Sequence, residues 1–135
     1  MESCIFCKIA KGEIPCAKVY ENSSVVAFLD ISPVNKGHVL VIPKLHFDTI
    51  LDIPDANLAE VFKAVKKISS AAMHAVDAKG FNIGINTYKA AGQLVPHFHV
   101  HIIPRFEDDR LESWPGKKYK EGEAEKLAEK IRKAL

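Results

Sequence analysis

Three histidines alternate at positions 97, 99 and 101, within the sequence HFHVHII. In an extended strand alternate side chains point the same way, so His97, His99 and His101 would share one face. An alternative interpretation is that the three histidines are solvated surface residues. If they were buried instead, their six ring nitrogens would need hydrogen-bond partners. Near neutral pH imidazole is a nucleophile, a proton carrier and a metal ligand. The pattern therefore predicts a strand that carries chemistry.

The spacing of these histidines separates the chemistries open to them. Neighbouring rings would lie about 6.6 Å apart along the strand and the outer pair about 13 Å apart, so a single metal held by all three is not expected. The alternative is one nucleophilic imidazole with neighbours that orient it or move protons. Phosphorus is a suitable target for a neutral imidazole. Gly92, just upstream, lets the backbone amides of residues 92–94 approach phosphate oxygens.

Hydrophobic patterning predicts the elements that position this strand. The five expected strands cover residues 17–20, 25–29, 38–43, 81–88 and 95–105. Apolar residues at three- and four-residue spacing predict a long helix over 54–78, with Gly80 placed to end it. A shorter amphipathic helix is expected from residue 121 onward. These elements predict an α+β fold, a mostly antiparallel five-stranded sheet with one long helix and a short C-terminal helix.

Composition narrows the class of protein. The chain of 135 residues fits one domain over residues 1–135, with its core at about 4–105 and a tail with a helix at 106–135. A net charge of +2 does not favour a nucleic-acid or membrane surface. No apolar run is long enough to span a bilayer, and the N-terminus does not resemble a signal peptide. Three cysteines fit a reducing environment, so we expect a cytoplasmic protein.

Taken together, the motifs resemble the histidine triad (HIT) family, and within it the Hint-like branch of nucleotide hydrolases and transferases. HFHVHII matches the signature of alternating histidines, and GQLV at residues 92–95 resembles the segment before it. Three more blocks follow the family in order and spacing: CIFCKI at 4–9, FLDISP at 28–33 and GHVLVIPK at 37–44. The similarity extends from about residue 4 to 105.

The resemblance implies a HIT-like fold and an enzyme that cleaves nucleoside 5′-phosphoramidates or dinucleoside polyphosphates. His99 would attack the α-phosphorus and carry a nucleotidyl intermediate, which water releases as a nucleoside monophosphate, while His101 and His38 handle protons and phosphate oxygens. Asp30 would accept hydrogen bonds from the ribose hydroxyls. The implied base pocket consists of Ile5, Phe6, Ile9, Phe28, Ile31 and Leu40. The residues implied near the phosphate are Asn86, Gly92, Gln93 and Val95.

The pair Cys4 and Cys7 leaves three interpretations open: a metal site, a redox pair or two small buried side chains. The resemblance implies zinc, because several microbial members of the family hold one with such a pair plus two histidines. The matching histidines here are His46 and His97. We therefore expect a structural zinc on Cys4, Cys7, His46 and His97, and no organic cofactor.

Two alternative functions and a dimeric assembly are also compatible with the sequence. A nucleotidyltransferase would use the same intermediate with an acceptor other than water, and a non-catalytic nucleotide-binding regulator would use only the pocket. Some relatives carry serine at the position of Leu94, and leucine cannot assist phosphate in that way. The resemblance implies a homodimer through the long helix and a strand edge, and a purine nucleotide substrate. Trp114 on the charged tail suggests that the tail reaches toward the partner's pocket.

Overall fold

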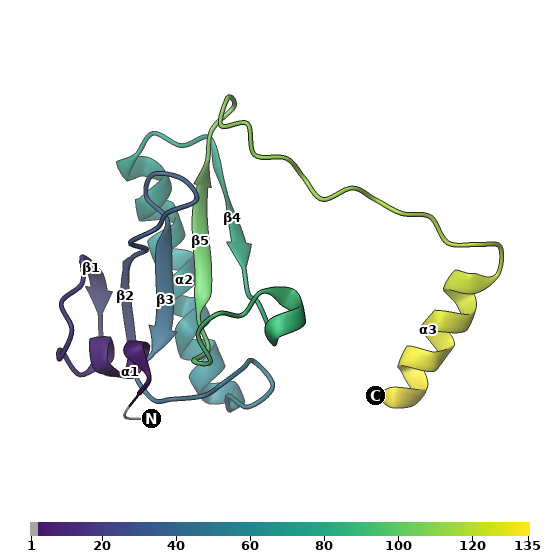
Figure 1. The fold of residues 1–135 in the computed structure, drawn as a ribbon, viewed down its shortest axis with the longest axis horizontal. Coiled ribbons are helices and arrows are strands. Elements are labelled where there is room, and N and C mark those ends of the chain that lie inside the picture. The colour runs from purple at the N-terminus through teal and green to yellow at the C-terminus, as the bar shows by residue number, and fades with distance from the viewer. Residues whose placement is uncertain (1–2) are drawn as a thin grey trace.

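The computed structural model describes residues 3–135, which form an α+β fold with an additional C-terminal arm (Figure 1). The strands are β1 (Lys18–Glu21), β2 (Val25–Leu29), β3 (Val39–Pro43), β4 (Gly80–Gly84) and β5 (Val100–Arg105). The helices are α1 (Ile5–Ala10), α2 (Asp55–Ala75) and α3 (Glu123–Ala134), and a single 3-10 turn covers Lys89–Ala91. No helix among residues 3–135 has the length and apolar character needed to cross a membrane.

The five strands form one sheet in the order β1-β2-β3-β5-β4, and every neighbouring pair is antiparallel. This confirms the predicted antiparallel sheet. The connection from β3 through α2 to β4 leaves a gap in the sheet, and β5 fills it, so that β5 lies in the interior and pairs with both β3 and β4. In that pairing Leu40 lies opposite His101 and Val41 opposite Val100, which brings the histidine strand beside the strand that follows His38.

Both faces of the central strands are buried, and alternation along each strand divides the side chains between them. Val25, Ala27, Val39 and Val41 face the core under α2. The next residues along the same strands face a second core with α1, which consists of Phe6, Ile9, Val26, Phe28, Leu40 and Ile42. Phe98, just before β5, and Val100 and Ile102 in β5 join the core under α2. The opposite face is therefore the one that carries the histidine chemistry.

Several element boundaries differ from the prediction. The long helix ends at Ala75 rather than near Gly80, because Asp77 takes a left-handed conformation with φ 55° and the Ala78 amide closes onto the Met73 carbonyl. Gly80 instead opens β4. Residues 4–11, predicted as a turn, contain helix α1, and the Cys4 side chain accepts a hydrogen bond from the Cys7 amide at its start.

The histidine segment is also less regular than predicted. The strand begins at Val100 rather than Val95, because the Phe98 amide donates to the carbonyl of Phe47 and not to a neighbouring strand. The partner strand β4 stops at Gly84, opposite His101. His97 and His99 therefore lie on a bent segment before β5, and their side chains are directed to different sites.

Beyond Arg105 the chain leaves the sheet as an extended segment that carries α3 far from the other elements (Figure 1). We call residues 106–135 the C-terminal arm. Its start is fixed by Asp109, whose carboxylate accepts hydrogen bonds from Arg105, from the Asn35 side chain and from the Phe106 amide. The apolar residues that predicted an amphipathic helix are present in α3, but none of its residues is buried.

Candidate active site and metal centre

His99 lies in the wall of a cavity of about 530 Å³ between α1, β2 and the loop before β5. We call this space the His99 cavity. The His99 ring is 7% exposed, and its Nδ1 donates to the carbonyl of His97 at 2.7 Å. That hydrogen bond fixes the proton on Nδ1, so Nε2 carries the lone pair. The edge of Phe6 packs on the ring at a centroid distance of 5.1 Å and holds its orientation.

His38 and His101 form a hydrogen-bonded pair whose tautomers follow from the backbone. The Val34 amide donates to His38 Nδ1 at 3.0 Å, so the proton of His38 resides on Nε2. His38 Nε2 then donates to His101 Nδ1 at 2.9 Å. In a neutral His101 the remaining proton is on Nε2, and the His101 ring lines the same cavity as His99. The result is a lone pair on His99 beside an N–H donor on His101, with ring centroids 4.9 Å apart.

Burial keeps these rings neutral. Loss of solvent, together with the neighbouring His99 and His38, lowers the pKa of His101 to about 4. Burial likewise lowers the pKa of His99 and of His38, while the Asp30 carboxylate opposes both shifts. Asp30 Oδ2 lies 3.7 Å from His38 Nε2. At neutral pH the site therefore offers an uncharged nucleophile and an uncharged proton donor.

These shifts predict a pH dependence of stability. Between pH 6.5 and about 4 the unfolded chain protonates its histidines while the folded His101 stays neutral, so the free energy of unfolding falls as the pH is lowered through this range. The slope of this decline is set by the number of protons that the chain takes up on unfolding. We expect His101→Asn to reduce that number by up to about one. Urea unfolding measured from pH 7 to 4.5 checks this, and a stability that stays level over that range contradicts it.

The opposite end of the His99 cavity is apolar. Phe6 and Phe28 meet edge to face at 5.6 Å, and Leu40 continues the same wall. Of the residues that the sequence implicated in nucleotide binding, the cavity lining includes Ile5, Phe6, Ile9, Phe28, Asp30, Ile31, Leu40, Asn86, Gly92, Val95, His99 and His101. Ile31 is 96% exposed and lies at the mouth. A flat apolar ring fits this end, with polar groups only near the histidines.

Gln93 is the predicted residue that does not line the cavity. Its Oε1 accepts from the Tyr88 amide, and its Nε2 donates to the carbonyls of Asp48 and Val95. The side chain therefore ties together the loop that presents Gly92 and Asn86. Gly92 has φ 89°, a conformation that a side chain would strain, and a Cβ there would lie 3.8 Å from the Asn86 amide nitrogen.

Sequence reasoning missed five residues of the cavity wall, and these are Ile14, Pro15, Cys16, Leu29 and Leu94. Ile14 to Cys16 carry no motif, and they reach the cavity only because the chain after α1 turns back along β2. Leu94 is 92% exposed at the rim, on the segment that joins Gly92 to the histidines. It adds apolar surface where a serine would add a hydroxyl.

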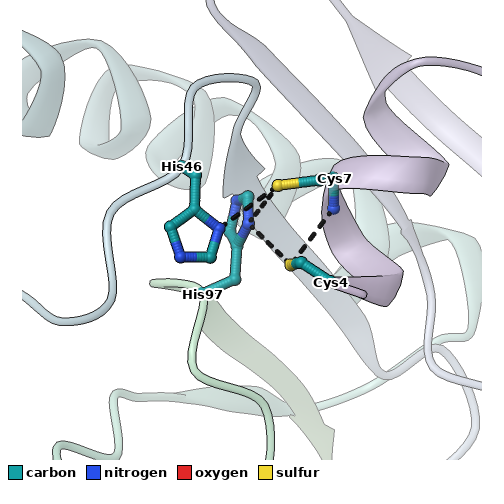
Figure 2. Close-up of side chains that lie close together, drawn as sticks. All are labelled: Cys4, Cys7, His46 and His97. Atoms are coloured by element: carbon teal, nitrogen blue, oxygen red, sulfur yellow. Dashed lines mark hydrogen bonds between the residues drawn. The ribbon is translucent and has the colours of Figure 1, made fainter. Parts of the chain in front are cut away.

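A second cluster lies behind the His99 cavity and consists of Cys4, Cys7, His46 and His97 (Figure 2). One ligand atom from each residue lies within 4.8 Å of all the others. Cys7 Sγ is 3.2 Å from His46 Nδ1 and 3.5 Å from His97 Nδ1, and Cys4 Sγ is 3.4 Å from His97 Nδ1. Sulfur and nitrogen ligands of a tetrahedral zinc lie about 3.5 Å apart, so this donor set fits zinc.

The surrounding hydrogen bonds orient both imidazoles toward the sulfurs. His97 Nε2 donates to the Pro43 carbonyl at 2.9 Å, and His46 Nε2 donates to the Asp48 carboxylate at 2.6 Å. Each bond leaves the lone pair on Nδ1, the atom that faces the cysteines. Asp48 and Pro43 were not predicted, since only the fold brings them beside these rings. Two imidazole lone pairs that face two cysteine sulfurs are the arrangement that a metal ion requires.

The two clusters share a backbone connection. His97 contributes its side chain to the cysteine cluster and its carbonyl to His99. Phe6, on the helix that follows Cys4, contacts both rings, with its centroid 5.9 Å from His97. Anything that holds Cys4 and Cys7 against His97 therefore also holds the apolar wall of the His99 cavity in place.

Known proteins resemble this chain in sequence and in fold. The model of the HIT domain matches residues 11–108. An adenosine 5′-monophosphoramidase of Schizosaccharomyces pombe is 40% identical over 131 residues, which cover 96% of each chain. The adenylylsulfatase HINT3 of Arabidopsis thaliana is 44% identical over 108 residues, covering 80% of this chain and 55% of that protein.

Solved structures extend the likeness to the whole chain. A Streptococcus mutans protein superposes with a TM-score of 0.94 at 43% identity, covering 99% of this chain and 86% of the other. A histidine triad family protein from Mycobacterium smegmatis, described as zinc-bound, superposes with a TM-score of 0.79 at 34% identity and covers 99% of each chain.

Proposed function

Because this chain belongs to the HIT family and is a hydrolase of that type, we propose that it cleaves nucleoside 5′-phosphoramidates or dinucleoside polyphosphates and releases a nucleoside monophosphate. One observation carries the proposal: the lone pair of His99 and the N–H of His101 enter the same cavity, whose far end is apolar. The relatives named as a phosphoramidase and an adenylylsulfatase act on different leaving groups, as their names state.

The first step forms a bond from His99 Nε2 to the α-phosphorus and breaks the bond from phosphorus to the leaving nitrogen or oxygen. His101 Nε2–H donates a hydrogen bond to the leaving atom, which takes up a proton from solvent, while His38 Nε2–H holds His101 in this tautomer. His99 becomes positively charged as the bond forms, and its Nδ1–H bond to the His97 carbonyl stabilises that charge. The product is a nucleotidyl-histidine and a protonated leaving group.

In the second step water attacks the same phosphorus from the side that the leaving group vacated. The proton of the attacking water passes to solvent, and His101 Nε2–H hydrogen-bonds to a phosphate oxygen. The bond from phosphorus to His99 Nε2 breaks, and the nucleoside monophosphate leaves with the oxygen from water. His101 and His38 keep their tautomers throughout, and the proton taken from solvent in the first step is returned in the second. A nucleotidyltransferase would differ only in the acceptor, and turnover that needs an added alcohol or phosphate would identify it.

Substrate binding follows from the lining of the His99 cavity. The base would lie between the aromatic and aliphatic side chains of α1, β2 and β3, contacting Phe6 and Phe28. Asp30 is placed to accept from the ribose hydroxyls, since one carboxylate oxygen is held by the Ser32 amide and the other faces His38. Asn86 and the amides near Gly92 would donate to phosphate oxygens. The apolar base site carries no side chain that would tell adenine from guanine.

The second cluster is proposed as a structural zinc site, with Cys4, Cys7, His46 and His97 as ligands. A zinc ion bound there would cross-link α1 to the segment before β5 and would take no part in the reaction. The four side chains leave no open position for substrate in such a site. The chain is proposed to act in the cytoplasm, where cysteines remain reduced.

Trapping the intermediate tests the proposal directly. Wild-type protein mixed with adenosine 5′-phosphoramidate or a diadenosine polyphosphate and quenched in alkali should gain the mass of one adenylate, located at His99 by peptide mapping. Phosphoramidates survive alkali and are lost in acid, so acid-quenched samples serve as the control. Release of AMP without any adduct under rapid quench would contradict the covalent route.

We further propose a homodimer through α2 and the edge strand β4. Phe62, Phe81 and Ile83 form an exposed apolar face there, and Ser69 Oγ beneath it has no hydrogen-bond partner among the described residues. We expect Ile83→Arg to raise the dimer dissociation constant about tenfold or more, because a charge would enter an apolar interface. Light scattering over a dilution series checks this. Leu51→Arg, on an exposed loop, should leave the dimer unchanged.

A further inference from the structure

The C-terminal arm ends in a helix that has no packing partner among residues 3–135. Leu127, Ile131 and Leu135 lie on one side of α3 and are 39%, 62% and 100% exposed. Isolated helices of this length are marginal in water, because most helical stability comes from packing of the apolar side. Figure 1 shows α3 clear of the sheet and of α2. A stable α3 therefore requires an apolar surface elsewhere.

The matching surface is a groove beside α2. It has a volume of about 480 Å³ and lies between the C-terminal half of α2 and strands β1 to β3. We call it the α2 groove. Ala71 and Ala75 form its helical wall, and Val19 and Leu29 form much of the opposite one. Val19 and Leu29 are 47% and 39% exposed, although both are large apolar residues. No described element of the chain covers them.

The α2 groove and α3 are complementary in shape and in charge. Alanines on α2 let a second helix approach closely, and Leu127 and Ile131 supply the bulk that would fill the space. Lysines 36 and 67 lie at the rim of the groove. The first turns of α3 carry Glu123, Glu125 and Glu129 beside the apolar stripe. Ion pairs at the rim would set the direction in which the helix lies.

The direction of the arm excludes its own groove as the resting place. Arg105 and Asp109 fix the arm where it leaves β5, and from there it passes beyond β4 (Figure 1). The α2 groove lies at the other side of the molecule, next to β1. The S. mutans structure superposes on this chain over 99% of its length at a TM-score of 0.94, which requires its arm, 30 of 135 residues here, to be held in the same place.

We propose that α3 of each copy of this chain docks in the α2 groove of a second copy, so that two chains exchange arms. Every chain carries one arm and one groove, so a reciprocal exchange satisfies both and closes as a two-fold dimer. The arm then packs on the helix side of the partner, near α2. This differs from a tail that enters the partner's His99 cavity.

Isotope-mixed cross-linking of the full chain tests the exchange. Equal amounts of natural and nitrogen-15 protein are mixed, allowed to equilibrate and treated with a lysine-specific cross-linker. We expect links from Lys36 or Lys67 to Lys126 or Lys130, half of them between one light and one heavy peptide. Leu127→Asp with Ile131→Asp should reduce these links about tenfold, because carboxylates would enter an apolar groove. Lys133→Asp, on the opposite side of α3, should leave them unchanged.

Each other outcome overturns the proposal in a recognisable way. Links in which both peptides are always light or always heavy would show that α3 returns to its own groove. Links from α3 to the region of residues 5–16 would place the arm at the His99 cavity instead. An undocked arm would give no links. In that case trypsin would also cut wild type and the double variant equally fast at lysines 117, 118 and 120.

Discussion

His99→Ala should abolish turnover of an adenosine phosphoramidate while leaving the affinity for AMP within a few-fold of wild type. His99 Nε2 is the atom that forms the bond to phosphorus, and no other ring nitrogen in the cavity has both a free lone pair and a fixed orientation. Removal of a covalent nucleophile costs about a thousandfold or more in kcat. The apolar wall and Asp30, which bind the nucleoside, remain. Steady-state kinetics and calorimetry with AMP measure the two quantities separately.

The matched control is His74→Ala, which removes an exposed histidine from α2 far from the cavity. It should leave kcat and KM unchanged. His101→Asn should lie between these extremes, since it keeps the nucleophile and loses the proton donor, and substrates with good leaving groups should suffer less than poor ones. A His99→Ala protein with substantial turnover would remove the covalent mechanism, although the protein could still bind nucleotides.

Cys7→Ser should lower the melting temperature by about 10 °C and the zinc content to well below one per chain. The substitution removes one of four ligands at a buried cluster, and loss of about 3 kcal/mol from a metal cross-link corresponds to a shift of that size in a chain of this length. The KM for nucleotide should rise as well, because Phe6 and Ile9 follow Cys4 on α1 and form the cavity wall. Metal analysis and calorimetry measure the first two effects.

Cys16→Ser is the matched control, the same chemical change at a cysteine outside the metal cluster. The Cys16→Ser protein should hold as much zinc as wild type and melt at the same temperature. Because Cys16 lines the cavity, this variant is a control for zinc content and melting temperature and not for KM. Wild-type protein that was supplied with zinc during expression and holds none after buffer exchange would contradict the metal assignment. In that case Cys4 and Cys7 would act as ordinary buried side chains.

The sequence was sufficient for the architecture. Short apolar runs predict the strands and a 3.6-residue period predicts α2, because strand length and helix period follow directly from backbone geometry. Element ends were predicted less well. The helix stopped at Ala75 because Asp77 could adopt a left-handed conformation, an outcome decided by local packing and not by the nearest glycine.

The histidine segment shows what alternation alone can predict. Alternation predicted that the three imidazoles share one face, and the fold agrees: Phe98, Val100 and Ile102 pack under α2, while Phe6 of α1 contacts the His97 and His99 rings on the other side. The tertiary structure assigns the imidazoles to two sites on that side, with His97 fully buried beside the cysteines and His99 and His101 in the cavity wall. The bend occurs because the Phe98 amide pairs with Phe47 across a loop. Such a contact between residues 51 positions apart leaves no trace in local sequence.

What the sequence determined by itself is therefore the set of reactive groups and the sheet that carries them, since residue type and periodicity are local properties. The tertiary structure decided which ring nitrogen holds a proton, because His99, His38 and His97 take their tautomers from the carbonyls and amides that the fold places beside them. It also decided which apolar residues remain uncovered. The stripe on α3 and the surface of the α2 groove look like ordinary core in sequence, and only their separation in space shows that each lacks a partner in the part of the chain that the structure describes.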